Sequence, residues 1–222
     1  MDYVFNYRGI WANKHLFLSG AVVTLEIAVL AMILGLLLGM VAAVARNSNN
    51  RFLRFSSSAF VEAIRNTPLL VQLYLWYFGL GYIRINISPF ICVVIALGIN
   101  NGSYLTEIIR VGIEAIKKEQ TSAGISLGMG RFQVFRYVVI VPALGIVFPA
   151  LCNQFIISIL ASALAMVIGV RDLTYEAVNL QARTFRSIET YIVVIIAYII
   201  LSKAAVIFSS RIDRRFFKHK YV

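Results

Sequence analysis

Polar residues interrupt two of the most apolar stretches of this 222-residue chain, and its chemistry must be inferred from them. In the first stretch Asn100, Tyr104 and Glu107 recur at i, i+4 and i+7, which places them on one face of a helix, with Asn101 beside them. The polar residues of the second stretch are Asn153, Gln154, Ser158 and Ser162. Amides and hydroxyls on two neighbouring helices can bind a polar solute without changing it covalently. The pattern therefore predicts the walls of a translocation cavity.

Hydrogen bonding between helices is the alternative for the same residues, because Ser, Asn and Gln commonly join helices in membranes. Both interpretations stay open for Asn100, Asn101 and Gln154, whereas hydrogen bonding is preferred for Ser158 and Ser162. A carboxylate inside a long apolar stretch, Glu26, needs either a partner or water, so both a pathway role and a structural role are open for it. The candidate pathway residues are Asn100, Asn101, Tyr104, Gln154, Ser158 and Glu26.

Motifs for catalysis are missing from the sequence. It contains no GxxxxGK[ST] phosphate loop and no HExxH motif, and its two histidines, His15 and His219, lie near opposite ends of the chain. We therefore expect no catalytic residue, no metal site and no cofactor in this chain. If the protein uses ATP, the hydrolysis must happen in another polypeptide.

The elements that position the polar residues are predicted to be membrane helices. Hydrophobic residues make up 60% of the chain, charged residues 14%, and the mean hydropathy is +0.82. The net charge of +11 does not indicate a nucleic-acid partner, because the basic residues lie between apolar blocks and form no solvated patch. We predict one all-α domain over residues 1–222, an integral membrane bundle embedded in the lipid bilayer. Its five expected spans lie near 18–45, 68–83, 88–109, 145–169 and 190–210, the second being short and broken by Gly79 and Gly81.

The distribution of Lys and Arg predicts the orientation in the membrane. Fourteen of the 21 lie in the segments 46–66 and 110–144 and in the tail from Arg211, and six lie on the other side. Because cytoplasmic segments carry the excess of positive charge, we expect these three segments to be cytoplasmic. Five spans place the ends of the chain on opposite sides, so the amino terminus is predicted outside and the carboxyl terminus in the cytoplasm.

Further charged residues are predicted to have structural roles. Glu107 and Arg65 lie near the same membrane face, and we expect an ion pair between them, with ligand contact by Glu107 as the alternative. Lys203, inside the last span, is expected to extend its amine to the cytoplasmic interface. The outer connection 171–189 has balanced charge and is expected to be a solvated loop, with contact to a soluble partner as the alternative.

The cytoplasmic segment 110–144 contains a possible docking element. Residues 119–127 can form about two turns of helix, and Gly128 is suited to the left-handed conformation that ends a helix. Small residues at 122–124 would let another protein approach the backbone, and an amphipathic stretch over 131–140 leads to Pro142, where the chain is expected to re-enter the membrane.

These segments resemble a known family. Glu119 to Pro142 is similar to the EAA loop of ABC importer permeases, in which an EAA triplet is followed four residues later by glycine and then by an apolar stretch that ends in Leu-Pro. Gly128 occupies the glycine and Val141-Pro142 the closing pair. Two upstream segments, 62–72 (EAIRNTPLLVQ) and 104–116 (YLTEIIRVGIEAI), look like signatures of the branch for histidine, glutamine and arginine.

The resemblance implies a type I permease fold in the inner membrane of a bacterial cell. It implies a second permease subunit (the same chain or a homologue), a cytoplasmic ABC ATPase dimer that binds ATP and Mg, and an external amino-acid-binding protein. The triplet reads Ser122-Ala123-Gly124 here, so its acidic residue is absent and Glu119 is a possible substitute. The coupling residues implied by the resemblance are Glu119, Ser122, Ala123, Gly124, Leu127 and Gly128.

Two other functions are possible for such a chain. A self-sufficient channel or secondary transporter is the first alternative, although the internal repeats typical of secondary transporters are not visible. A membrane scaffold without transport is the second. If the chain carries amino acids, the membrane carboxylates Glu26 and Glu107 favour a cationic or neutral amino acid over an acidic one.

Overall fold

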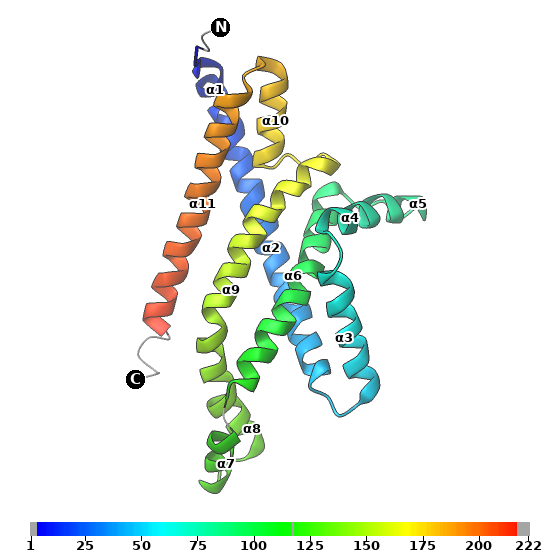
Figure 1. The fold of residues 1–222 in the computed structure, drawn as a ribbon, viewed down its shortest axis with the longest axis vertical. Coiled ribbons are helices and arrows are strands. Elements are labelled where there is room, and N and C mark those ends of the chain that lie inside the picture. The colour runs from blue at the N-terminus through cyan, green and yellow to red at the C-terminus, as the bar shows by residue number, and fades with distance from the viewer. Residues whose placement is uncertain (1–3, 117, 217–222) are drawn as a thin grey trace.

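Every element in the described part of the chain is helical, and the long helices run side by side in an elongated bundle (Figure 1). The structure is a computed structural model that describes residues 4–116 and 118–216. The α-helices are α1 (Arg8–Ala12), α2 (Lys14–Arg46), α3 (Arg51–Arg65), α4 (Leu69–Tyr74), α5 (Leu80–Tyr82), α6 (Pro89–Glu114), α7 (Lys118–Ser126), α8 (Arg131–Gln133), α9 (Val141–Ala161), α10 (Leu173–Thr184) and α11 (Ser187–Phe216). Two π-helical segments, Leu75–Gly79 and Val134–Ile140, and a 3₁₀ segment, Ser162–Ile168, connect some of them.

Four helices among the described residues are long and apolar enough to cross a membrane. They are Lys14–Arg46, Pro89–Glu114, Arg131–Ile168 and Ser187–Arg215. This confirms the prediction of an all-helical membrane bundle. The short helix α1 and the last turn of α11 lie toward opposite ends of the bundle (Figure 1), while residues 217–222 lie outside the described part of the chain.

The second predicted span differs from the prediction. Its apolar helix, Leu69–Tyr82, is shorter than a membrane crossing and lies across the long helices (Figure 1). Pro68 has an extended backbone (φ −61°, ψ 134°), and a proline also disfavours helical geometry in the residue before it, so α3 and α4 cannot join into one straight helix. The segment 46–66, predicted as a cytoplasmic connection, instead contains α3, which returns along the lower part of α2 and packs against it and α6.

The fourth predicted span corresponds to a helix that is longer than predicted. We expected the chain to re-enter the membrane at Pro142, but one helical run extends from Arg131 to Ile168. The segment before Pro142 is π-helical (Val134–Ile140). A proline has no backbone N–H to donate, and its ring would clash with the carbonyl four residues earlier in a regular α-helix. A π-helical turn accommodates both effects. The run therefore connects the predicted cytoplasmic loop directly to the middle of the bundle.

Helices α2 and α6 pack closely against each other through glycines. A Cβ added to Gly35 would lie 2.6 Å from Cβ of Asn101, and one added to Gly39 would lie 2.8 Å from Cβ of Leu105. On the other helix, a Cβ at Gly98 would lie 2.6 Å from Cδ2 of Leu34. Small residues at four-residue spacing allow backbones to approach in this way in membranes, where the lipid provides no hydrophobic force between helices.

We predict that Gly39→Ala destabilises the protein and that Gly81→Ala does not. The first Cβ would overlap Leu105 and push α2 from α6, at a cost of about 1–3 kcal/mol for an overpacked contact. The matched control, Gly81 in the middle of α5, has no atom within 4 Å of the added Cβ. The thermal unfolding midpoint of each purified variant in detergent measures the difference. Equal midpoints for the two variants would contradict close α2–α6 packing.

Candidate functional site

Of the polar residues on α6, Asn100 and Tyr104 lie against α4 and α3, whereas Asn101 turns toward α9. Asn100 Nδ2 lies 3.5 Å from Oε1 of Gln72 on α4. The guanidinium of Arg65, at the end of α3, lies 5.0 Å above the ring of Tyr104, a cation–π geometry. The stripes on α6 and α9 therefore do not face each other as two walls of one cavity within this chain.

Asn101, Gln154 and Ser158 form a buried hydrogen-bonded triad between α6 and α9. Nδ2 of Asn101 donates to Oγ of Ser158 at 3.0 Å, and Nε2 of Gln154 donates to Oδ1 of Asn101, also at 3.0 Å. The exposed fraction of each residue is 5% or less. This geometry corresponds to the interhelical hydrogen bonding that the sequence left as an alternative, and a pathway role for the triad stays a prediction.

Gln72 closes the break between α3 and α4, a role that the sequence analysis missed. Its Nε2 donates to the carbonyl of Ile64 at 2.8 Å and to Oγ1 of Thr67 at 2.8 Å. The carbonyls at the end of α3 have no partners within that helix, so a buried amide that reaches back to them stabilises the turn. A glutamine soon after a Thr-Pro pair was the available signal.

Glu107 does not pair with Arg65, so that prediction is wrong. Its carboxylate pairs with Arg46, at the end of α2, and with Arg110, whose Nη2 lies 3.0 Å from Oε2. Arg110 also contacts Glu114 at 2.6 Å, one helical turn further on. The register between α2 and α6 brings Arg46 to Glu107, while Arg65 approaches from α3 and lies over Tyr104 instead.

A polar pocket of about 410 Å³ opens beside this charged cluster. It lies between α2, α3 and α6, and its lining includes Arg46, Glu62, Arg65, Tyr104 and Glu107. Guanidinium groups can bind a carboxylate and carboxylates can bind an ammonium group. The pocket can thus hold a small zwitterionic solute, and its side chains include no activated nucleophile.

At the other end of the bundle, Asp172 forms a buried cap on α10. Its Oδ1 accepts from the backbone N–H of Tyr175 at 2.9 Å, and its Oδ2 from that of Thr174 at 3.2 Å. The hydroxyl of Tyr198, on α11, donates to Oδ2 at 3.4 Å. Burial of the carboxylate raises the pKa of Asp172 from 3.8 to about 6, although the hydrogen bonds oppose the shift.

Two more carboxylates of the connection 171–189 are buried, which corrects the expectation of a solvated loop. Glu176 is 2% exposed; its Oε1 accepts from Nε of Arg171 at 2.8 Å, and its Oε2 has no hydrogen-bond partner among the described atoms. Glu189 is fully buried, and its Oε1 accepts from the backbone N–H of Asn6 at 3.0 Å. The connection thus packs as α10 onto the bundle and ties down the amino-terminal segment.

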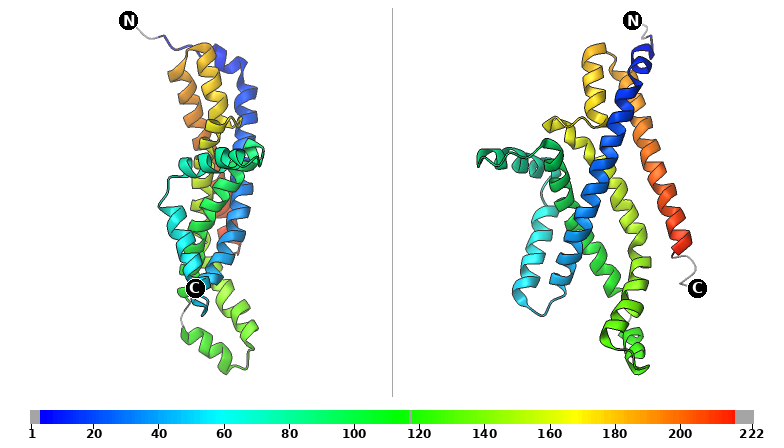
Figure 2. Two further views of the ribbon diagram at one scale, coloured as in Figure 1. Left: turned by 90° about the vertical axis from the view of Figure 1, so that its right-hand side faces the viewer. Right: turned by 180° about the vertical axis from the view of Figure 1, so that it is seen from behind.

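The segment from α7 to α8 forms a tip at one end of the molecule, beyond the ends of the other helices (Figure 2). Gly128 has φ +82°, which confirms the predicted left-handed residue. The N–H of Met129 donates to the carbonyl of Gly124 at 3.2 Å, and that of Gly128 to Ile125 at 2.9 Å. This pair of bonds is a Schellman motif, which ends α7 and turns the chain.

Side chains at the tip divide into an inner and an outer set. We had expected Gly124 to offer a surface to another protein. It is instead buried against Val134, so its small size serves packing within the chain. Ser122 and Ala123 are exposed, and Leu127 is 83% exposed. Glu119 belongs to α7, but its side chain lies outside the part that the structure describes. The sequence analysis missed two further exposed apolar residues of the tip, Ile125 and Phe132.

We predict that the triad contributes to stability as one unit. Asn101→Ala and Gln154→Ala should each lower the free energy of unfolding by about 0.6–1.7 kcal/mol, the range for hydrogen bonds between membrane helices. The double variant should lose less than the sum of the two, because both substitutions remove the same bond. Asn153→Ala, at the exposed neighbouring position on α9, is the matched control and should change nothing. Strictly additive losses would show that the two amides do not interact.

A second prediction concerns pH. Because the pKa of Asp172 is higher in the folded protein than in the unfolded chain, folding favours the protonated carboxyl: the stabilisation is complete below pH 3.8 and is lost as pH rises through about 6. Asp172→Asn keeps the helix cap but cannot ionise. Thermal unfolding from pH 4 to pH 8 should therefore show a fall in midpoint for the wild type that is smaller in Asp172→Asn. Parallel curves for the two proteins would refute the shifted pKa.

Comparisons with known proteins agree with this geometry. Residues 35–218 match the family described as binding-protein-dependent transport system inner membrane component. The chain is 36% identical over 213 residues to the glutamine transport system permease protein GlnP of Escherichia coli (strain K12), which covers 95% of this chain and 97% of GlnP. A putative glutamine transport system permease protein GlnP of Rickettsia prowazekii (strain Madrid E) is 36% identical over 175 residues, covering 78% of each chain.

Solved structures show the same arrangement of helices. A chain from the crystal structure of an amino acid ABC transporter with histidines matches with a TM-score of 0.89 at 38% identity, covering 96% of this chain and 100% of that chain. A chain from an inward-facing structure of the MetNI methionine ABC transporter matches with a TM-score of 0.77 at 18% identity, covering 93% of this chain and 99% of that one, and shows the fold alone. The chain therefore belongs to the binding-protein-dependent transport system inner membrane components, as a multi-pass ABC transporter permease for amino acids.

Proposed function

We propose that this chain is the permease subunit of an ATP-driven importer of polar amino acids. It forms the translocation pathway with a second permease subunit and receives its substrate from an external amino-acid-binding protein. A cytoplasmic ATPase dimer binds ATP and Mg and hydrolyses the nucleotide, so that this chain supplies movement and no covalent chemistry. The names of the relatives, which describe glutamine and amino acid transport, support this class of substrate.

The observation that carries the proposal is the tip formed by α7 and Gly128. It exposes Leu127, Ala123 and the backbone of the turn at the very end of the molecule, where a second protein can approach without meeting the rest of the bundle. A continuous helical run leads from Arg131, beside the tip, to Ile168. A push on the tip is therefore transmitted along a rigid element into the middle of the membrane.

The role proposed for the tip also fixes the orientation of the protein in the membrane. It lies on the cytoplasmic side, where the ATPase is found, and this agrees with the excess of Lys and Arg in the same segments. The amino terminus and the buried carboxylates of α10 then lie outside, toward the binding protein. The triplet at the tip reads Ser122-Ala123-Gly124, so the ATPase contact rests on Ala123, Leu127 and Gly128 and needs no acidic side chain there.

Among the candidate pathway residues, Asn100 and Tyr104 are partly exposed. The triad of Asn101, Gln154 and Ser158 is buried. Tyr104 lines the polar pocket between α2, α3 and α6, whose guanidinium and carboxylate groups suit the two charged ends of an amino acid. We place the inner part of the pathway there. Arg46 and Arg65 balance the charges of Glu62 and Glu107 in the lining, so the pocket best suits an amino acid whose side chain is neutral.

The test compares two substitutions of one glycine. At φ +82° a β-branched residue is strained, at roughly 1–2 kcal/mol, whereas asparagine tolerates the left-handed conformation. No atom lies within 4 Å of the added Cβ, so strain and not a clash distinguishes the variants. We expect Gly128→Val to abolish uptake of radiolabelled amino acid at near-normal membrane abundance, and Gly128→Asn to retain most of it.

The ATPase gives a second measurement on the same variants. In Gly128→Val it should either be lost from the purified complex or remain bound with hydrolysis that no longer responds to the loaded binding protein. If Gly128→Val transports normally with its ATPase attached, the tip is not the coupling element, and the proposal loses its main support.

A further inference from the structure

A groove of about 750 Å³ lies on the surface of the bundle where α1, α2 and α11 meet. Its floor belongs to the apolar core, because Ile10 and Phe17 are only 5% and 7% exposed. Its rim is open, since Ile200 on α11 is 61% exposed. Apart from Tyr7 and Lys14, every described residue that lines this α1–α2–α11 groove carries an apolar side chain.

One end of the groove carries a positive charge. Lys14, the first residue of α2, lines this end, is exposed, and takes part in no ion pair within the described part of the chain. The carboxylates of Asp172, Glu176 and Glu189, at the same end of the bundle, are buried and bonded to other groups. The ammonium group of Lys14 therefore lacks a neutralising partner among the described residues, and an anion from outside the chain fits there.

The groove has the depth of one leaflet of a membrane. On α2 it extends from Lys14 to Ala21, seven residues further and about 10 Å along the helix. On α11 it extends from Ile192 to Leu201, nine residues further and about 14 Å. Half of a hydrocarbon core of about 30 Å is about 15 Å. Trp11, beside Lys14 in the lining, is 70% exposed, and tryptophan is common where the hydrocarbon meets the lipid headgroups. The groove therefore runs from the membrane interface toward the middle of the bilayer.

The groove faces away from the part of the bundle to which the pathway is assigned. Helix α11 lies on one side of α2 and α3 on the other (Figure 1 and Figure 2), and the polar pocket lies between α2, α3 and α6. Only 11% of the most apolar window of α11 is buried within the chain. Because the pathway and the second permease subunit belong on the α3 side, lipid covers the α11 side. This step rests on the proposed function.

We propose that the α1–α2–α11 groove binds one anionic phospholipid, with an acyl chain along the groove and the phosphate at Lys14. A chain of methylene groups needs no hydrogen bonds from the lining, whereas the phosphate accepts a charge-assisted hydrogen bond from the ammonium group. A zwitterionic phospholipid carries a cationic group of its own, which repels Lys14. An anionic lipid such as phosphatidylglycerol is therefore preferred.

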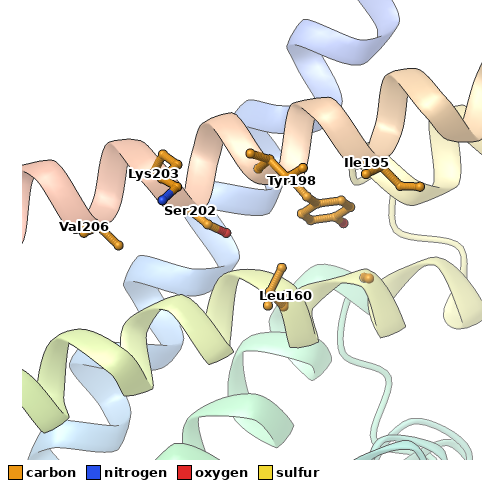
Figure 3. A pocket seen from close by; sticks show the side chains of 8 residues that line it. Leu160, Ile195, Tyr198, Ser202, Lys203 and Val206 are labelled. Carbon is orange, nitrogen blue, oxygen red and sulfur yellow. The ribbon is translucent and has the colours of Figure 1, made fainter.

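A second apolar groove lacks this order of groups. It has a volume of about 560 Å³ and lies between α9 and α11 (Figure 3). Its cation, Lys203, lies partway along α11, with Ile195 toward one end and Val206 toward the other. A headgroup there would lie within the apolar part of the groove, and a charged group inside the hydrocarbon is costly. In the α1–α2–α11 groove the charge lies at the end, which matches the head and tail of a lipid.

Photolabelling locates the lipid in the full transporter. Nanodiscs contain phosphatidylglycerol or phosphatidylcholine, each with the same diazirine-bearing acyl chain, and labelled peptides are identified by mass spectrometry. We expect phosphatidylglycerol to label residues 14–21 and 192–201 several-fold more than phosphatidylcholine does. Lys14→Gln should remove this preference, and Lys14→Arg should keep it. The matched control, Arg183→Gln, removes an exposed cation of α10 that does not line the groove, and should change nothing.

Two results of this experiment would overturn the proposal. Equal labelling by the two lipids in the wild type, or a preference that survives in Lys14→Gln, would show lipid that surrounds the protein without a specific site. Labelling elsewhere on α11 but not at 14–21 and 192–201 would show that a membrane helix of another protein covers the groove in the assembled transporter.

Filling the groove supplies an independent measurement. Ala21→Phe places a ring in the groove, and Val29→Phe, at an exposed position of α2 outside its lining, is the matched control. A ligand that binds only the folded protein raises the midpoint of thermal unfolding. Phosphatidylglycerol added in detergent should raise the midpoint of the wild type and of Val29→Phe equally, and that of Ala21→Phe by less than half as much. An equal rise in all three would contradict binding in this groove.

These readouts do not depend on transport. If the chain fails to support ATP-driven uptake, the proposed function falls, but labelling and thermal unfolding still report whether the groove binds an anionic lipid. Conversely, a transporter that is active but shows no preference for phosphatidylglycerol at the groove leaves the function intact and removes only this site.

Discussion

The close contact between α2 and α6 determines where most other groups of the molecule lie. Glycines at 35 and 39 on α2 and at 98 and 102 on α6 let each helix press its side chains against the backbone of the other. Within lipid, apolar side chains gain nothing by leaving the solvent for a protein interior, so helices are held by fit and by hydrogen bonds. Because the glycines at this contact lack Cβ atoms, α2 and α6 can approach closely, and the other helices pack around this pair.

The register of this pair sets the direction of the polar residues on α6. Gly35 lies against Cβ of Asn101, which directs the amide of that residue toward α9 and its partners Gln154 and Ser158. The same register carries the last residue of α2, Arg46, to Glu107. Because interhelical hydrogen bonds in membranes are individually small, about 0.6 kcal/mol on average, the triad specifies the orientation of α9 more than it stabilises the bundle.

The run from Arg131 to Ile168 links the two ends of the proposed mechanism. Its first turns pack on α7 at the tip, where Val134 lies against Gly124, and its membrane part carries Gln154 and Ser158 of the triad. A π-helical turn before Pro142 keeps the helix continuous where a proline would otherwise break it. In the proposed mechanism, a displacement of the tip would reach the hydrogen bonds that join α9 to α6, so the triad would connect the helical run to the glycine-packed pair of α2 and α6.

Hydropathy and local backbone rules were enough to derive the class of the protein from its sequence. A long apolar stretch must be a helix in lipid because its backbone groups have no other partners, and a glycine after a short helix adopts the left-handed turn, as Gly128 does. The motifs around Gly128 and in the segments 62–72 and 104–116 indicated the family. Each of them is a contiguous stretch of the chain, so it can be recognised without knowledge of the tertiary structure.

Only the tertiary structure decided which residues meet. Periodicity places Asn100, Tyr104 and Glu107 on one face of α6, but not which helix that face touches, so Glu107 was assigned to Arg65 although Arg46 is its partner. The break at Pro68 turns an apolar stretch across the bundle, and buried Glu176 and Glu189 lie in a connection that sequence alone describes as balanced and solvated. The spacing Gly35–Gly39 and Gly98–Gly102 was the one signal for the contact that arranges these groups. Register between helices depends on the shapes that fit together in space, and a linear pattern does not contain that information.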